Sequence, residues 1–483
     1  MKLYIITGII LLAGCKKYLE EEPKKQASIQ TVTQLEALVD NAPAFYDEQD
    51  ITAVFSTDDN EISKDLYKKN PGAFTIDNMQ YYVFSVDGLV GAAADQLWNI
   101  EFKKIFTANL ILANIDNVTG DQATKDRVKA DAYFIRAYSY WVLLNHYCAP
   151  YTSANLNSMG LPLKNTIEYT GSLKRATLKE TYDFMLADIA EAKKTAYDDV
   201  DPRRAWRISQ KAISAFMSRF YLFTGDYDKS IEEANKALAT TTAKLVDYKT
   251  LIPGRSNTYA NPAVTLNYIE LNDWVAAKFL YWSEFYYTRY INNRAQWFIP
   301  STALLASYDQ ANDLRYKNLM MPNGGRRFSV IDPATFRYTM FSDGSYAPTG
   351  PTVAEVLLNK AEALARKNDA GGAMDAVNIL RLKRMSTYIA LTAADKNDAI
   401  KKVLEERRRE MPFVMRWYDI RRLSVNDHPA DDITVTRDFF NVSITGVDVN
   451  TPKAYTLDSK RYLLPLNGVE IDASKGQLTQ NPY

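Results

Sequence analysis

Cysteine and histidine are both scarce in this sequence, with only two of each among 483 residues. Two cysteines cannot supply a four-cysteine zinc site. Two histidines are few for metal binding or acid–base catalysis, for which histidine is the usual side chain. The sequence also lacks the motifs HExxH, GxSxG, GxGxxG and the P-loop. Paired carboxylates leave no such signature, so these absences make an enzyme less expected without excluding one.

An excess of charge of one sign and a long apolar run are missing as well. Lys and Arg together number 58, and Asp and Glu together also number 58. Because this balance creates no global field that would attract nucleic acid, we expect no nucleic-acid partner. No run of 18 or more apolar residues is present, so we expect no membrane-spanning helix.

The N-terminus does carry a recognisable pattern. Lys2 precedes an apolar run over residues 3–12, which has the length of a signal-peptide core. The Leu-Ala-Gly-Cys that ends at Cys15 resembles the cleavage site of bacterial lipoproteins. The resemblance implies that Cys15 becomes the first mature residue and carries lipid; the alternative is a plain secretory signal. We therefore expect a signal peptide at 1–14, a lipidated tether at 15–30 and a single folded domain at 31–483.

Apolar residues recur with helical spacing through most of the expected domain. At 209–240 and again at 353–384, two apolar stripes flank a short Gly-containing turn, a pattern typical of tetratricopeptide repeats. Further helices are expected at 98–116, 127–147 and 177–196. Loop-like insertions are expected at 41–97, 148–176 and 241–350, and a non-helical end with short strands at 430–483. We predict a mainly α fold of interrupted tetratricopeptide-like helical repeats, with long loop insertions and a few short strands. Its helical N-terminal portion covers about 31–240, and its insertion-rich and C-terminal portion about 241–483.

Several sequence blocks, taken in order, resemble the SusD/RagB family. Each block alone is weak, but together they cover essentially the whole chain. The blocks are Lys-Lys-Tyr-Leu-Glu at 16–20, the Trp98, Ile105, Asn109 and Ile115 helix, Arg-Ala-Tyr-Ser-Tyr at 136–140, the helical pair at 354–384, Glu-Arg-Arg-Arg-Glu at 406–410, Arg-Trp-Tyr-Asp-Ile-Arg-Arg at 416–422, and the C-terminal blocks at 462–466, 470–471 and 478–482.

The resemblance implies a lipid-anchored outer-membrane protein that faces the cell exterior. It also implies a SusC-like, TonB-dependent transporter as partner, and an oligosaccharide or, in the RagB-like branch, a peptide as ligand. Binding without catalysis is implied, so we expect no catalytic residues, no cofactor and no metal. Two rival hypotheses remain open: a surface glycan hydrolase, and a helical scaffold without a small ligand.

The segment 274–298 is the main candidate for ligand binding, because aromatic residues alternate there with amides and an arginine. Sugar recognition uses flat apolar faces for the ring and polar groups for the hydroxyls. The predicted contacts are Trp274, Tyr281, Trp282, Asn293, Arg294 and Trp297. The alternative is that the aromatic side chains of this segment are simply buried.

A second candidate is the aromatic stretch at 79–84, in which Tyr81 and Tyr82 would contact ligand. The alternation of residues in this stretch also fits an ordinary short strand.

Two charged clusters have structural explanations. In the block at 405–422, Glu405 with Arg409 and Asp419 with Arg422 have the spacing of helical ion pairs. Asp309 and Asp313 supply too few oxygens for calcium, so we interpret them as helix caps and surface charge.

Overall fold

The computed structural model describes the chain from Ile29 to the C-terminus with several gaps. The described residues are 29–48, 51–90, 96–168, 171–250, 282–292, 298–324, 328–330, 332, 334–338, 340 and 346–483. Six predicted functional residues lie outside them: Cys15, Trp274, Tyr281, Asn293, Arg294 and Trp297. Among the residues described, no helix combines the length and the apolarity that crossing a membrane requires.

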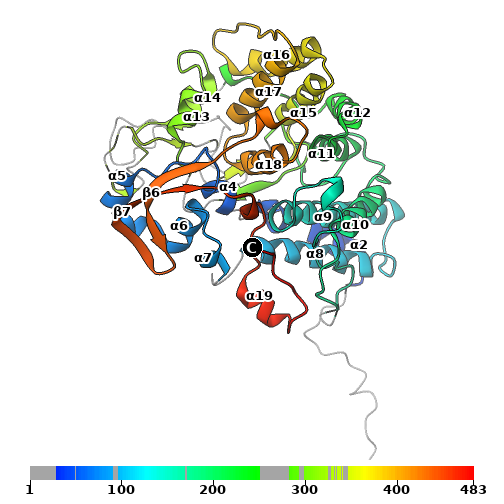
Figure 1. The fold of residues 1–483 in the computed structure, drawn as a ribbon. Helices are drawn as coiled ribbons and strands as arrows, with labels where there is room; N and C mark the ends of the chain where they lie inside the picture. The colour runs from blue at the N-terminus through cyan, green and yellow to red at the C-terminus, as the bar shows by residue number, and fades with distance from the viewer. Residues whose placement is uncertain are drawn as a thin grey trace, which may run out of the picture.

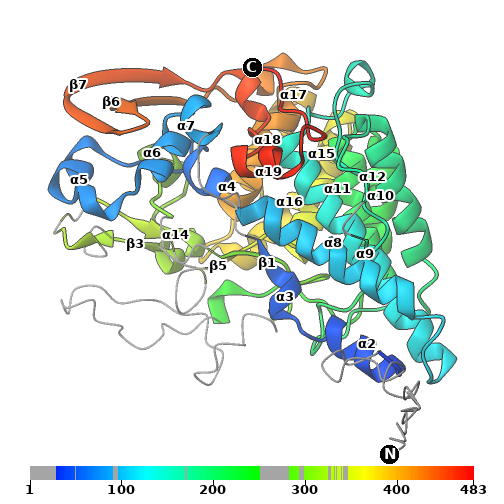
Figure 2. The ribbon, with the colours of Figure 1, turned by 90° about the horizontal axis from the view of Figure 1, so that it is seen from below.

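A stack of antiparallel helices forms one side of the molecule (Figures 1 and 2). The stack consists of α8 (Gln96–Asn114), α9 (Gln122–Tyr147), α10 (Leu178–Ala192), α11 (Gln210–Phe223), α12 (Tyr227–Leu238), α15 (Val353–Arg366), α16 (Ala370–Arg384) and α17 (Lys396–Glu410). Helix α9 packs between α8 and α10, and α11 pairs with α12. Helix α15 packs against α12, α16 and α17 and so joins the two halves of the sequence. The predicted mainly α fold with interrupted helical repeats is confirmed.

Both predicted helix–turn–helix units are present, and their turns follow from local sequence. Between α11 and α12, Gly225 has φ +80°, a conformation that glycine adopts without strain. Asp226 then caps α12 by accepting a hydrogen bond from the backbone N–H of Lys229. In the second unit, Asp369 caps α16 by accepting a hydrogen bond from the backbone N–H of Gly372. This glycine therefore lies inside the helix and not in the turn, where the sequence placed it.

Helix α9 is buried almost all round along its C-terminal two-thirds, because apolar side chains occupy more than one of its faces. Trp141 is 1% exposed and meets Phe216, Phe220 and Phe223 of α11 edge-on or tilted. These aromatic contacts join α9 to the first helical repeat and form the centre of the core.

The other described residues form short elements that pack around this stack. The short helices are α2 (Val32–Val39), α3 (Pro43–Tyr46), α4 (Ile51–Phe55), α5 (Lys64–Lys69), α6 (Ile76–Tyr82), α7 (Asp87–Val90), α13 (Thr302–Ala306), α14 (Leu314–Leu319), α18 (Val414–Leu423) and α19 (Gly468–Ala473). Much of the expected loop at 41–97 is therefore helical. These helices are too short to show apolar periodicity. Their sequence signals are local, such as the N-cap residues Ser63 of α5 and Thr75 of α6.

The strands among the described residues form three small sheets. β1 (Asp47–Glu48) pairs in parallel with β2 (Tyr290–Asn292), which pairs antiparallel with β5 (Tyr346–Pro348). β3 (Met320–Met321) pairs with β4 (Arg337–Tyr338). A hairpin of β6 (Thr436–Ser443) and β7 (Gly446–Thr456) lies at the opposite end of the molecule from α2 (Figures 1 and 2), as expected for a C-terminal region with short strands.

Candidate functional site

The second predicted contact region is a helix and not a strand. Residues 76–82 form α6, so the strand alternative for this stretch is wrong. Tyr82 is 2% exposed, and its hydroxyl accepts a hydrogen bond from Ile62 N–H and donates one to Ile62 O. Its ring meets Phe439 of β6 edge-on. Tyr81 is half-buried, so of this pair only Tyr81 presents part of its surface to solvent.

The described part of the main candidate segment, 282–292, lies in the core. Trp282 is 4% exposed, and the four aromatic side chains that follow are at most 1% exposed. Tyr287 meets Phe134 of α9, and Tyr290 meets Tyr46 and Phe285. These residues therefore fix the segment to the helical stack, and contact with a ligand would fall to its other members.

A buried ion network holds β2 in place. The Arg289 guanidinium lies 2.7 Å from Glu48 and 2.8 Å from Glu101, and both carboxylates are at most 1% exposed. Lys104 donates to Glu101 and to the carbonyl oxygen of Asp47. Burial lowers the pKa of Lys104 to about 8, and burial raises the pKa of Glu48. Sequence reasoning missed this network because its members are up to 241 residues apart.

The three-stranded sheet of β1, β2 and β5, held by this ion network, forms a frame. The register of the sheet shows where the predicted contacts join it. Asn292, the last residue of β2, pairs with Tyr346, the first residue of β5. Asn293 and Arg294 follow Asn292 directly in the sequence. The chain therefore leaves the frame at the C-terminal end of β2, which is paired with the beginning of β5. The predicted contacts follow from this point.

Trp282 borders a small cavity of about 30 Å³ beneath this frame. The cavity is lined by Trp282, Tyr338, Met340, Ala347, Pro348, Thr349, Gly350, Thr352, Met411, Pro412, Met415, Glu284, Glu355 and Glu410. This volume is about that of one water molecule and is too small for a sugar ring. The three carboxylates are ion-paired, Glu284 and Glu410 with Arg384 and Glu355 with Arg219. The cavity thus offers neither room for a sugar nor an unpaired acid.

Gly350 is a position at which the frame tolerates no side chain. A Cβ atom there would lie 1.9 Å from the carbonyl oxygen of Tyr287 and 2.8 Å from the N atom of Arg289. We expect Gly350→Ala to lower the free energy of unfolding by about 1–3 kcal/mol, because backbone must shift to relieve the clash. Urea unfolding measures this loss, and Gly446→Ala, which meets nothing within 4 Å, is the control. Equal stability of the two variants would contradict the close approach of β2 to residue 350.

The charged block at 405–422 is a structural network, as predicted. Arg407 pairs with Asp419 at 2.9 Å, and Arg422 pairs with Asp419 at 2.8 Å. One expected pair is wrong: Arg409 pairs with Glu406 at 2.9 Å, and Glu405 is exposed. Glu406 is the buried neighbour because it faces α14, where it also meets Arg315 at 2.7 Å.

The helices of this block are interrupted at 411–413, since α17 ends at Glu410 and α18 begins at Val414. Phe413 between them has φ +65°, and its backbone N–H donates to Asp59 at 3.0 Å. This bond fixes the reversal of the chain between the two helices.

Of the acidic pair at 309 and 313, only Asp313 has the predicted role of a helix cap, whereas Asp309 is exposed and closes a turn. Asp309 accepts hydrogen bonds from the backbone N–H groups of Ala311 and Asn312. Asp313 caps α14, but it is buried and not on the surface, because it forms a 2.7 Å ion pair with Arg315. Within the described ranges, no group of three or more His, Cys, Asp or Glu side chains is placed to hold a metal ion.

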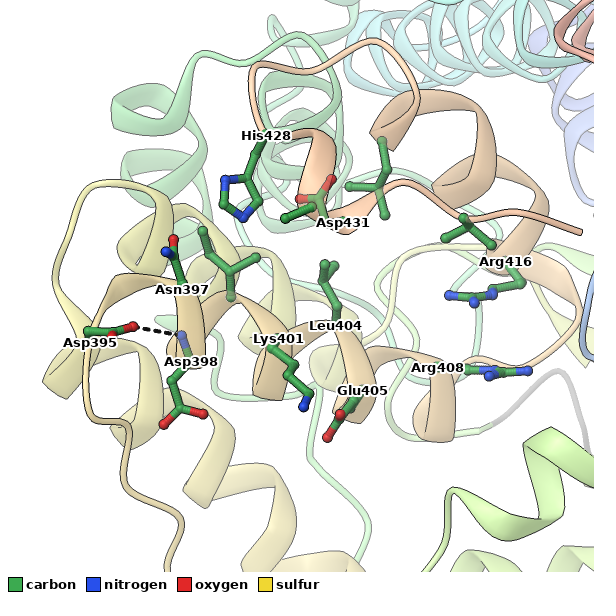
Figure 3. Close-up of a pocket in the computed structure, with 14 residues that line it drawn as sticks. Asp395, Asn397, Asp398, Lys401, Leu404, Glu405, Arg408, Arg416, His428 and Asp431 are labelled. Carbon is green, nitrogen blue, oxygen red and sulfur yellow. Dashed lines mark hydrogen bonds between the residues drawn. The ribbon is translucent and has the colours of Figure 1, made fainter.

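A larger cleft of about 570 Å³ lies between α17 and the chain that follows α18 (Figure 3). It is lined by Asp395, Asn397, Asp398, Ile400, Lys401, Leu404, Glu405, Arg408, Arg416, Leu423, His428, Ala430, Asp431 and Ile433. No Trp, Tyr or Phe is among these residues, so the cleft lacks the flat apolar faces that we expect of a sugar site. Sequence analysis did not identify this cleft, because it forms only when two separate segments come together.

Comparisons with known proteins agree over both halves of the chain. Residues 17–222 match a family model described as "Starch-binding associating with outer membrane", and residues 280–483 match one described as "SusD family". The SusD-like protein P2 of Formosa agariphila is 22% identical over 539 aligned residues, which cover all of both chains.

Solved structures show the same fold. A putative sugar binding protein from Bacteroides vulgatus superposes with a TM-score of 0.64 at 18% identity, covering 95% of this chain and 99% of that chain. Surface glycan-binding protein A from Bacteroides uniformis superposes with a TM-score of 0.62 at 12% identity, covering 93% and 98%. The two family models, which between them match residues 17–222 and 280–483, show that the chain belongs to the SusD family, whose members associate with the outer membrane.

Proposed function

We propose that this chain is a cell-surface lipoprotein that binds an oligosaccharide and delivers it to a SusC-like, TonB-dependent outer-membrane transporter. Family membership supports the general role, since relatives are named as sugar-binding and surface glycan-binding proteins. The location of the contacts within the chain needs a separate argument.

The distribution of tryptophan carries this argument. The chain has seven tryptophans. Trp98, Trp141, Trp282 and Trp417 are buried, and the half-buried Trp206 donates its indole N–H to Asp40 at 3.1 Å. The other two, Trp274 and Trp297, belong to the predicted contact segment. We propose that these two, with Tyr281, Asn293 and Arg294, contact the sugar, and that the buried residues 282–292 provide their support.

The proposed mechanism is binding and release without covalent chemistry. A ligand shifts such a protein toward a transport-ready state only by binding that state more tightly. The proposal therefore requires no free acid–base pair, in agreement with the ion-paired carboxylates around Trp282.

Membrane attachment is proposed to occur through lipid on Cys15. The described chain begins at Ile29, beside the α8–α9 turn, where Val32 N–H donates to Thr119 O. Residues 15–28 would span at most about 50 Å when fully extended, which suits a tether. We expect Cys15→Ser to move the protein from the membrane fraction to the soluble fraction, as measured by fractionation and immunoblotting. Unchanged membrane retention of this variant would contradict a lipid anchor at residue 15.

Affinity electrophoresis of the chain lacking residues 1–15 tests the ligand class. The protein is run through native gels that each contain one polysaccharide, and a peptide pool is tested in parallel by calorimetry. The proposal predicts retardation by one glycan class. Binding to peptides alone would refute the oligosaccharide proposal and favour peptide capture.

A further inference from the structure

The cleft beside α17 has the dimensions of an extended chain. One wall is α17, from its cap Asp395 to Arg408, a length of about 20 Å at 1.5 Å per residue. The other wall is the chain at 423–433. A length of 20 Å corresponds to about six extended residues. The cleft volume of about 570 Å³ lies within the range of well-formed ligand sites.

Aliphatic side chains from both walls line the middle of this cleft. Ile400 and Leu404 come from successive turns of α17, and Leu423, Ala430 and Ile433 come from the opposite wall. Figure 3 shows Leu404 pointing toward the opposite wall, whereas Lys401 and Glu405 point away from His428 and Asp431. Branched aliphatic side chains accept side chains of their own kind but give a sugar ring no flat surface.

The two ends of the cleft carry opposite charge. At one end, Arg408 and Arg416 line the cleft. Asp58 pairs with Arg408 at 3.1 Å and with Arg416 at 2.7 Å, but does not itself line the cleft. At the other end, Asp395 lines the cleft. Figure 3 shows Asp431 on the opposite wall, facing Leu404; its ion-pair partner Arg366, at 2.8 Å, does not line the cleft. Each pair thus presents only one member to the cleft. The acidic end would repel nucleic acid, and charged groups at both ends suit an acyl chain poorly.

We propose that this cleft binds a linear peptide segment of a partner protein in extended form. The segment is about six residues long, with aliphatic side chains in the middle, a basic residue at the Asp395 end and an acidic residue at the Arg416 end. Helical-repeat proteins commonly use such surfaces for binding, and α17 packs directly against α15 of the second repeat. The cleft shares no lining residue with the predicted sugar contacts, so this proposal goes beyond the glycan function.

Titration calorimetry with synthetic hexapeptides tests the proposal. The first probe, blocked at both termini, has Lys at one end, four central Leu and Ala residues, and Glu at the other end. The second probe has Gln in place of both charged residues, and the third is maltohexaose. We expect saturable binding of the charged peptide, about tenfold weaker binding of the neutral peptide, and no displacement of the charged peptide by maltohexaose.

Two variants and one control assign the binding to the cleft. Leu404→Asn removes an apolar contact, and Ala430→Trp fills the cleft from an exposed position, so the second variant avoids the risk of misfolding. Both are expected to weaken peptide binding at least tenfold. Leu382→Asn, on the exposed face of α16 outside the cleft, is expected to leave it unchanged. All three variants should keep the retardation of the parent protein by polysaccharide.

The proposal is overturned if the charged peptide does not bind up to millimolar concentration. It is also overturned if Ala430→Trp binds the peptide as the parent protein does, or if maltohexaose displaces the peptide. None of these results bears on glycan capture, which the electrophoresis of the same variants reports separately.

Discussion

Glu362→Gln is expected to lower the free energy of unfolding by about 3 kcal/mol at neutral pH. Glu362 is fully buried and accepts two 2.7 Å hydrogen bonds from Arg422 and one of 2.8 Å from Arg366. A neutral amide leaves both guanidinium groups without this charge. The loss falls at the lower end of the usual range of about 3–5 kcal/mol, because Arg422 keeps Asp419 and Arg366 keeps Asp431.

The same substitution carries a pH signature. Burial alone would raise the pKa of Glu362, but Arg422 and Arg366 hold it well below its usual value of 4.5. A carboxylate with a lowered pKa stabilises the fold fully above pH 4.5, and this contribution is lost as the pH falls toward the folded-state pKa. Urea unfolding should therefore show a constant difference between parent and variant from pH 7 to 5 and a shrinking one at lower pH.

The matched control for this prediction is Glu232→Gln on α12. Glu232 is exposed and pairs with Lys236 on the surface, so its loss should change the free energy of unfolding by less than about 1 kcal/mol. An equal effect of the two substitutions, or a Glu362→Gln effect independent of pH down to 3, would contradict the buried network.

Replacing both Trp274 and Trp297 with Ala is expected to weaken binding of the captured glycan at least 100-fold. Large aromatic side chains contribute disproportionately to binding sites, and each truncation of such a contact commonly costs tenfold or more. The four buried tryptophans support the fold. Of these six tryptophans, we therefore expect only Trp274 and Trp297 to contribute to glycan affinity. Titration calorimetry with the glycan identified by electrophoresis measures the change.

Tyr197→Ala serves as the control for this double variant. Tyr197 is 40% exposed, and its ring lies 3.9 Å below the guanidinium of Arg127, far in sequence from the predicted segment. Its removal should leave glycan affinity unchanged. Full affinity in the double variant, with its fold intact, would move the site away from segment 274–298.

Sequence periodicity predicted the long helices well because each buries a continuous apolar stripe. The units at 209–240 and 353–384 and the buried helix at 127–147 correspond to α11–α12, α15–α16 and α9. Short helices were missed, since α4 and α6 have too few turns to establish a period, and alternating aromatics at 79–84 resembled a strand. The cap at Thr75 was the local signal that favoured a helix there.

Pairing between distant charged residues could not be predicted from one sequence. The spacing of Glu405 and Arg409 fits an ion pair as well as that of Glu406 and Arg409. The packing of α14 and α16 around α17 decides between them, because it places Arg315 and Arg381 beside Glu406. Likewise, nothing in the sequence relates Glu48 and Glu101 to Arg289, since the fold alone brings them together.

The sequence predicts a candidate segment for the site, and this prediction could not be refined residue by residue from composition. Composition marked 274–298 as aromatic and polar, and could not distinguish rings that face the core from rings that face a ligand. The structure makes this distinction for Trp282 and for Tyr82, both of which are buried. The proposed contacts in this segment therefore concentrate on Trp274, Tyr281, Asn293, Arg294 and Trp297.

One titration tests the central claim, capture of a glycan without chemical change, most directly. The retarding oligosaccharide is titrated into the chain lacking residues 1–15, incubated overnight and then recovered for analysis of its length by chromatography. We predict saturable binding and recovery of the oligosaccharide at its original length. Recovery of shortened sugar from the pure protein would contradict the account and make the chain a hydrolase.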